Sequence, residues 1–130
     1  MAVDMNMNIL IVDDYKTMLR IIENLLKQLG FKNVQQATDG SMALKLLRES
    51  AAPFGLVISD WNMDPMTGLQ LLKEVRADVK LKPTPFIMIT AESKVENVAA
   101  AKEAGVNNYI VKPFNAETLK QKISAVLGAF

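Results

Sequence analysis

The stretch Asn8-Ile9-Leu10-Ile11-Val12-Asp13-Asp14 decides the fold, because an apolar run ends there abruptly in two acids. Three later runs have the same form: Leu56–Ser59 ends in Asp60, Phe86–Ile89 ends in Thr90, and Tyr109–Val111 ends in Lys112 and Pro113. Continuous apolar runs of this length are typical of parallel strands covered on both faces. The carboxyl ends of such strands share one edge of the sheet, where open α/β folds bind ligands. The sequence therefore predicts a cleft holding three carboxylates, a hydroxyl and an ammonium group.

Strand-like runs alternate with amphipathic helical patterns five times along the chain. This alternation predicts an α/β fold, a (βα)5 doubly wound five-stranded parallel sheet with helices on both faces. The first helical pattern ends at Gly30, and its apolar stripe is Met18, Ile21, Ile22, Leu25, Leu26 and Leu29. Val34–Ala37 is short and polar, which predicts an edge strand. The pattern fills the chain, so residues 1–130 are expected to form a single domain without an output domain.

The composition excludes several kinds of site. A net charge of +1 over 130 residues gives no case for a nucleic-acid or anionic-membrane surface. The chain has no cysteine and no histidine, which excludes disulfides, thiolate sites and imidazole bases. Met1–Met7 lacks the features of a signal peptide, and no apolar run approaches the roughly 18–20 residues of a membrane span. A soluble cytoplasmic protein is expected, with chemistry limited to carboxylates, hydroxyls, lysine or a hard metal.

Asp13, Asp14 and Asp60 are the candidate ligands of a metal. A single acid after a strand more often caps the next helix. Three converging carboxylates, however, repel one another unless a cation offsets their charge, and Mg²⁺ prefers carboxylate oxygens. Residues 61–63 separate Asp60 from the next helical pattern, so Asp60 is not placed as a cap. A carboxylate in this position can attack phosphorus and form an acyl phosphate.

Lys112 and Thr90 complete the predicted cleft. Lys112 stands between a strand and Pro113, which favours an inward orientation in which its ammonium group neutralises phosphoryl charge. Thr90 by itself is an ordinary β-branched strand residue, but at this edge its hydroxyl can bond a phosphoryl oxygen. The sequence does not favour the uncommon cis form of the Lys112–Pro113 bond.

The order and spacing of these motifs carry a resemblance over nearly the whole chain. The motifs are Val12-Asp13-Asp14, Asp60 with Gly68 eight residues later, Thr90-Ala91-Glu92 and Lys112-Pro113-Phe114. They resemble the receiver domain of two-component response regulators. Ser59-Asp60-Trp61-Asn62-Met63 is most similar to the CheY-like chemotaxis members of that family. The resemblance implies a flavodoxin/CheY-like sheet with strand order 2-1-3-4-5.

The resemblance also implies a role for each matching residue. Asp60 would be the phosphoacceptor, and Asp13, Asp14, Asp60 and the backbone carbonyl of Asn62 would hold Mg²⁺. Thr90 and Lys112 would contact the phosphoryl group, Tyr109 would be a switch coupled to Thr90, and Asn62 and Glu92 would tune hydrolysis. The partner face would comprise Val95, Val98, Tyr109 and Lys122.

A phosphorylation-dependent signalling switch is the function that this resemblance implies. A histidine kinase would donate the phosphoryl group, and a flagellar motor switch protein or another phosphorylation-dependent target would bind the active form. The chain would be a monomer. It would not be an enzyme, since it would catalyse only its own phosphorylation and dephosphorylation. Two positions depart from the family: Asp64 stands where receivers usually carry proline, and Val95 stands where the chemotaxis members carry lysine. The second departure leaves the partner's identity open.

Other functions are compatible with parts of the same pattern. The chain could drain phosphoryl groups from a shared kinase, or serve as a docking scaffold without phosphorylation. A Mg²⁺-dependent aspartyl phosphatase is less well supported, because such enzymes usually carry an acid where Asn62 stands. A flavodoxin-like cofactor module would need a Ser/Thr/Gly-rich phosphate cradle, and acids occupy its place.

Overall fold

Five strands and five helices alternate in the computed structural model, which describes residues 3–64, 66–91 and 95–130. The strands are β1 (Asn8–Val12), β2 (Asn33–Ala37), β3 (Phe54–Asp60), β4 (Phe86–Thr90) and β5 (Asn108–Val111). The helices are α1 (Lys16–Gln28), α2 (Gly40–Glu49), α3 (Gly68–Ala77), α4 (Val95–Glu103) and α5 (Ala116–Leu127). Neighbouring strands are parallel in the order β2-β1-β3-β4-β5, which confirms the predicted fold class and strand order. Within the described ranges, no helix has the length and apolarity needed to cross a membrane.

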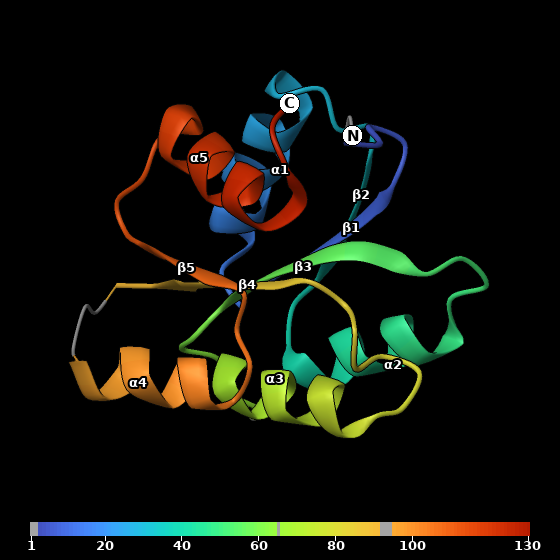
Figure 1. Cartoon of the computed structure of the whole chain (residues 1–130), viewed down its shortest axis with the longest axis vertical. Helices are drawn as coiled ribbons and strands as arrows, with labels where there is room; N and C mark the ends of the chain where they lie inside the picture. Colours follow the sequence, from blue (N-terminus) through green and yellow to red (C-terminus); the bar gives the residue numbers. More distant parts are fainter. Residues whose placement is uncertain (1–2, 65, 92–94) are drawn as a thin grey trace.

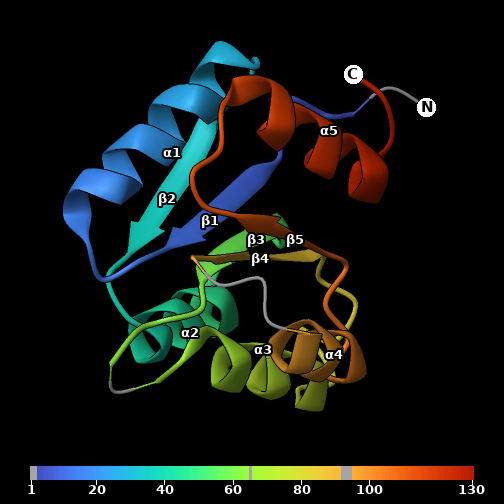
Figure 2. The same cartoon turned by 90° about the vertical axis from the view of Figure 1, so that its left-hand side faces the viewer.

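Helices cover both faces of the sheet. Helices α1 and α5 lie on one face, and α2, α3 and α4 lie on the other (Figures 1 and 2). Along β1, Ile9 and Ile11 enter the hydrophobic cluster beneath α1 and α5. Leu10 and Val12 enter the opposite cluster, because successive side chains of a strand point to opposite faces. Burial on both faces explains why the inner strands read as continuous apolar runs.

The sheet confirms one sequence prediction and corrects another. Strand β2 lies at an edge and is exposed at most positions, as its polar sequence predicts. The predicted start of β3 at Leu56 is wrong, because the strand begins at Phe54 and includes Gly55. The pairing with β1 shifts register at this point, which leaves Gly55 as the extra residue of a bulge.

Helices α2 and α3 begin at side-chain caps. Asp39 accepts a hydrogen bond from the backbone N–H of Met42 at 2.8 Å and so caps α2. At α3, the Thr67 hydroxyl accepts from the Gln70 N–H, and the Gln70 side chain accepts from the Thr67 N–H. At the other end of α1, Gly30 has φ 109°, which confirms the predicted glycine stop.

Candidate functional site

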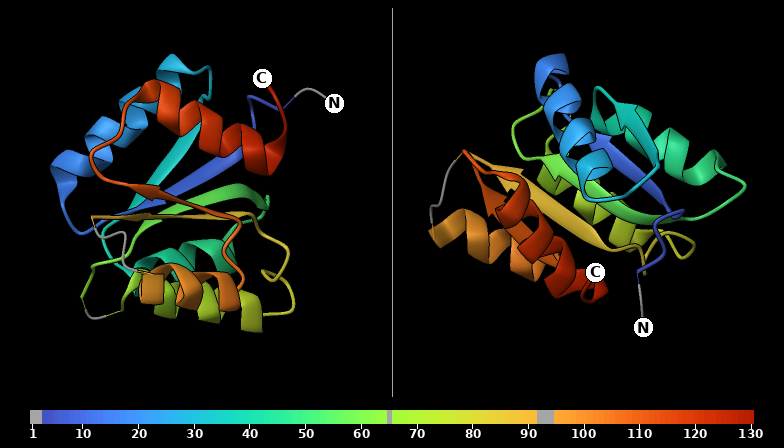
Figure 3. Two further views of the ribbon diagram at one scale, coloured as in Figure 1. Left: turned by 60° about the vertical axis from the view of Figure 1, so that its left-hand side comes forward. Right: turned by 90° about the horizontal axis from the view of Figure 1, so that it is seen from above.

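The loops that follow β1, β3 and β5 gather at one end of the sheet (Figure 3, left). Backbone hydrogen bonds continue the strand pairing to the site residues and just past them. The N–H of Asp13 donates to the carbonyl of Ala37 at 3.2 Å, and that of Lys112 donates to the carbonyl of Thr90 at 2.8 Å. The N–H of Trp61, next to Asp60, donates to the carbonyl of Ile89 at 2.8 Å. The sheet itself therefore positions the functional side chains.

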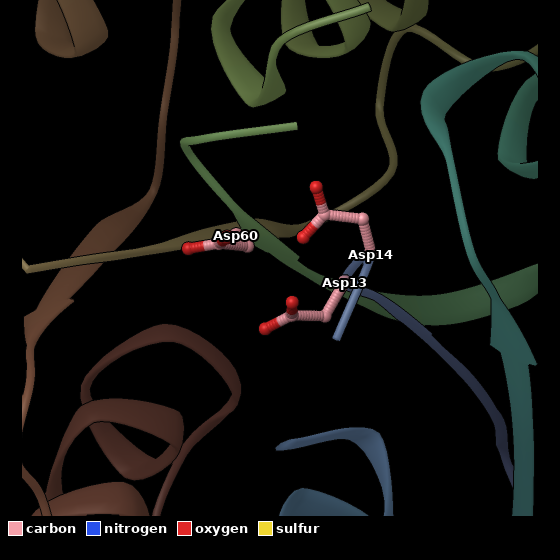
Figure 4. A group of neighbouring side chains, drawn as sticks. All are labelled: Asp13, Asp14 and Asp60. Atoms are coloured by element: carbon pink, nitrogen blue, oxygen red, sulfur yellow. The ribbon is translucent and has the colours of Figure 1, made fainter. Parts of the chain in front are cut away.

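The three acids converge as predicted. Asp13, Asp14 and Asp60 each offer one oxygen, and these oxygens lie within 4.8 Å of one another (Figure 4). The side chains differ in burial: Asp13 and Asp60 are 1% and 6% exposed, whereas Asp14 faces solvent. Two of the three possible ligands are therefore held in the protein and the third lies at the mouth of the site.

Lys112 is the cation of this cluster. Its Nζ lies 3.2 Å from Asp60 Oδ1, where it donates a hydrogen bond, and 3.8 Å from Asp13 Oδ2. The predicted inward orientation of Lys112 is therefore observed. The Lys112–Pro113 bond is cis, a feature that the sequence did not favour.

Burial raises the pKa of both inner acids. Burial raises the pKa of Asp13 to about 6, although the N–H of Tyr15, which donates to Asp13 Oδ1 at 2.9 Å, opposes this shift. Burial also raises the pKa of Asp60, and the charge and hydrogen bond of Lys112 act in the opposite direction. Desolvation thus destabilises the ionised forms of both acids. A further positive charge nearby would stabilise these ionised forms.

The donor set fits a hard cation. Asp13 Oδ2 is buried, and no hydrogen-bond donor in the described part of the chain reaches it. The Lys112 Nζ atom lies 3.8 Å from this oxygen, a distance too long for a hydrogen bond. A buried carboxylate oxygen without a donor is costly unless a metal ion coordinates it. Three carboxylates against one ammonium group also leave net negative charge for a divalent ion to offset.

Thr90 and Tyr109 line one small cavity. Thr90 is 4% exposed, and the cavity walls also include Trp61, Met88 and Val98. Lys122 Nζ lies over the Tyr109 ring, 5.2 Å from its centroid. The structure thus brings together Thr90, Tyr109, Val98 and Lys122, which the sequence assigned to the switch and the partner face. Val95 begins α4, but its side chain and all of Glu92 lie outside the described residues.

Gly68 has a steric role that sequence reasoning did not identify. A Cβ at this position would lie 2.2 Å from the backbone oxygen of Asp60 and 2.7 Å from Met88 Sδ. The N–H of Gly68 also donates to the carbonyl of Trp61 at 2.9 Å. The first turn of α3 therefore packs directly on the backbone of the candidate phosphoacceptor, which only a residue without a side chain permits.

Comparisons with known proteins agree with this geometry. The response regulator receiver domain family matches residues 9–124. Chemotaxis protein CheY-3 of Vibrio cholerae is 54% identical over 121 residues, which cover 93% of this chain and 92% of that protein. Chemotaxis protein CheY of Pseudomonas aeruginosa is 52% identical over 120 residues, covering 92% and 95%. The solved structure of Vibrio cholerae CheY4 superposes with a TM-score of 0.86 at 35% identity, covering 94% and 99%.

Proposed function

The chain belongs to the response regulator receiver domain family, and from this premise we propose that it is a phosphorylation switch whose phosphoacceptor is Asp60. The observation that carries the proposal is the buried Asp60 at the end of β3, with Lys112 Nζ at 3.2 Å and two further carboxylates beside it. A histidine kinase is the proposed donor, because the chain contains no histidine of its own. The chain acts on itself and turns over no separate substrate.

Mg²⁺ is the proposed cofactor. Asp13, Asp14, Asp60 and the backbone carbonyl of Asn62 would hold it, and it would supply positive charge to the phosphoryl oxygens. Asp60 attacks phosphorus, the oxygen–phosphorus bond forms, and the phosphorus–nitrogen bond of the donor histidine breaks. The electron pair of that bond leaves with the donor imidazole.

Lys112 and Thr90 act on the transferred group. The Lys112 ammonium group already contacts Asp60 Oδ1. It can therefore stabilise the negative charge on the phosphoryl oxygens as the acyl phosphate forms. The Thr90 hydroxyl would bond a phosphoryl oxygen. Since Thr90 and Tyr109 line the same cavity, a shift of Thr90 would change the space open to the Tyr109 ring. The exposed side of this region, with Val98 and Lys122, is the proposed partner face.

The chemotaxis relatives support a role in control of swimming, with a flagellar motor switch protein as the proposed target of the phosphorylated form. Val95, which begins α4, stands where the sequence resemblance to CheY implies a lysine, so the partner contacts would differ there.

Trp61 gives a direct test of the proposed function. It is the only tryptophan, is half-buried, and follows Asp60 directly. Its fluorescence should change on addition of Mg²⁺ and again on addition of acetyl phosphate, and the intact mass should increase by one phosphoryl group. A protein that shows neither a metal response nor a mass increase would instead be a docking scaffold.

In the metal-free protein, the contribution of Asp13 to the free energy of unfolding is expected to fall as pH rises from about 3.8 to about 6. Burial raises the pKa of Asp13 from 3.8 to about 6, so the folded state binds this proton more tightly than the unfolded state. The stabilisation by Asp13 is complete below the pKa that this residue has in the unfolded state. It is lost as pH rises through the pKa that the residue has in the folded state. It amounts to at most about 3 kcal/mol.

Urea unfolding across this pH range, in EDTA and in saturating Mg²⁺, measures the effect. Asp13→Asn should flatten the metal-free profile in part, because Asp60 shifts in the same direction and remains. Saturating Mg²⁺ should also flatten it, since the ion binds the ionised carboxylates. An unchanged slope in Asp13→Asn would contradict the assignment to this residue.

Lys112→Met is expected to tighten Mg²⁺ binding roughly tenfold. The Lys112 ammonium group competes with a metal ion for Asp60 and Asp13, which lie 3.2 and 3.8 Å away. Methionine keeps an apolar stem of similar length and removes the charge. Titration of Trp61 fluorescence with Mg²⁺ measures the dissociation constant. The matched control is Lys32→Met, at an exposed position beyond the opposite end of α1. Weaker Mg²⁺ binding in Lys112→Met would show that the lysine supports the metal rather than competing with it.

A further inference from the structure

An open pocket of about 270 Å³ adjoins the acid cluster. The loops after β1 and β3 form it, and its lining residues are Asp14, Asn62, Met63, Asp64 and Thr67. Asp14 belongs both to this pocket and to the three converging carboxylates. The pocket is therefore continuous with the site where the phosphoryl group would bind.

The charge around Asp60 is distributed unequally. Asp14 and Asp64 are both exposed in this pocket, and none of its lining residues is basic. Lys112 instead lines a different pocket, with Met18, Ile21, Pro113 and Phe114. A phosphodonor approaching Asp60 would thus meet an ammonium group on one side and two carboxylates on the other.

We propose that Asp64 is a specificity-determining residue that selects phosphodonors by the charge of their leaving group, an inference that rests on the proposed function of Asp60. A donor with a nitrogen leaving group is favoured over one with a carboxylate leaving group. The basis is the negative charge that Asp64 adds to the pocket. This charge repels an anionic leaving group and does not repel a neutral one.

Two small donors differ in this property. In phosphoramidate the nitrogen is protonated, the net charge is −1, and the nitrogen leaves as ammonia with the electron pair of the broken phosphorus–nitrogen bond. Acetyl phosphate carries a net charge of −2, and its carboxylate leaves as acetate with the electron pair of the broken phosphorus–oxygen bond. In both reactions Asp60 forms the new oxygen–phosphorus bond. Only the second reaction releases an anionic leaving group, which Asp64 would repel in this pocket.

Asp64→Asn tests the proposal in the full chain at saturating Mg²⁺. The rate of phosphoryl gain is measured with each donor by Trp61 fluorescence and intact mass. The acetyl phosphate rate should rise about fivefold, and the phosphoramidate rate should stay the same or fall, so that the ratio of the two rates rises at least about fivefold. Asp64→Glu should keep the wild-type ratio. High salt should reduce the difference between wild type and Asp64→Asn, because exposed charges are screened.

Asp39→Asn is the matched control. It makes the same charge change at the same edge of the sheet, away from the pocket, and asparagine caps α2 as well as aspartate does. Its rate ratio should equal that of the wild type. The proposal is overturned if Asp64→Asn changes both rates by the same factor, or changes neither, or if Asp39→Asn gives the same ratio. If the wild type gains no phosphoryl group from either donor, the proposed function fails first, and this inference fails with it.

Discussion

Asp60→Asn is expected to gain no phosphoryl group from acetyl phosphate, a loss of at least about 10³-fold in rate. The amide that replaces the carboxylate has no ionised oxygen to attack phosphorus. It also removes the negative charge of one of the three acids whose oxygens lie within 4.8 Å of one another, so the affinity for Mg²⁺ should fall as well. Asparagine has nearly the same shape as aspartate, so the buried end of β3 should remain folded.

Intact mass after incubation with Mg²⁺ and acetyl phosphate measures this result. Asp39→Asn makes the same charge change just after the edge strand β2 and should gain one phosphoryl group as the wild type does. Circular dichroism of both variants checks that they are folded. Phosphoryl gain in Asp60→Asn at the wild-type rate would place the phosphoacceptor on another residue, and Asp13 and Asp14 would be the next to replace.

Gly68→Ala is expected to destabilise the protein by about 3 kcal/mol. Alanine is normally the better helix former, by up to about 1 kcal/mol, so this exchange in α3 would ordinarily stabilise the protein. Here the added Cβ would meet the backbone oxygen of Asp60 at 2.2 Å. Backbone in the middle of the sheet cannot move aside at low cost, so the helix or the end of β3 must shift. The sign of the effect is therefore opposite to that of helix propensity.

Gly55→Ala, in the same strand as Asp60, is the control for this prediction. Its nearest contact would be Met7 Sδ at 2.7 Å, which belongs to a flexible side chain that can turn away. Urea unfolding should show a small change in Gly55→Ala and a large loss in Gly68→Ala. The rate of phosphoryl gain should fall in Gly68→Ala as well, because the Asp60 backbone is displaced. Equal stability of the two variants would contradict the predicted close packing of α3 on Asp60.

The sequence was sufficient to predict the sheet because its signals are local. Burial on both faces makes Ile9–Val12 continuously apolar, and the polar character of Val34–Ala37 follows from its edge position. Once the strands are parallel, the residue after each strand must lie at one edge. The convergence of Asp13, Asp60 and Lys112 therefore followed from sequence alone.

Other features of the site depend on distances that no sequence pattern carries. The approach of Gly68 to the Asp60 backbone arises from the packing of α3 on β3, and the bulge at Gly55 from the pairing of β3 with β1. Asp13 and Asp14 are identical in type and converge on the same site, yet one is buried and the other is exposed. The reciprocal cap of α3 was a signal that could have been found, since Thr67 and Gln70 have the spacing of a capping box.

The hydrogen bonds that continue the strand pairing at Asp13, Trp61 and Lys112 have a consequence for protein engineering. The reactive groups are anchored to the sheet, whereas Asn62 and Asp64 come from the connecting loop that follows. Chimaeras that exchange only this loop with a chemotaxis relative should keep the capacity to be phosphorylated and acquire the relative's kinetic preferences. Reactivity and selectivity would then be separable modules, open to independent redesign.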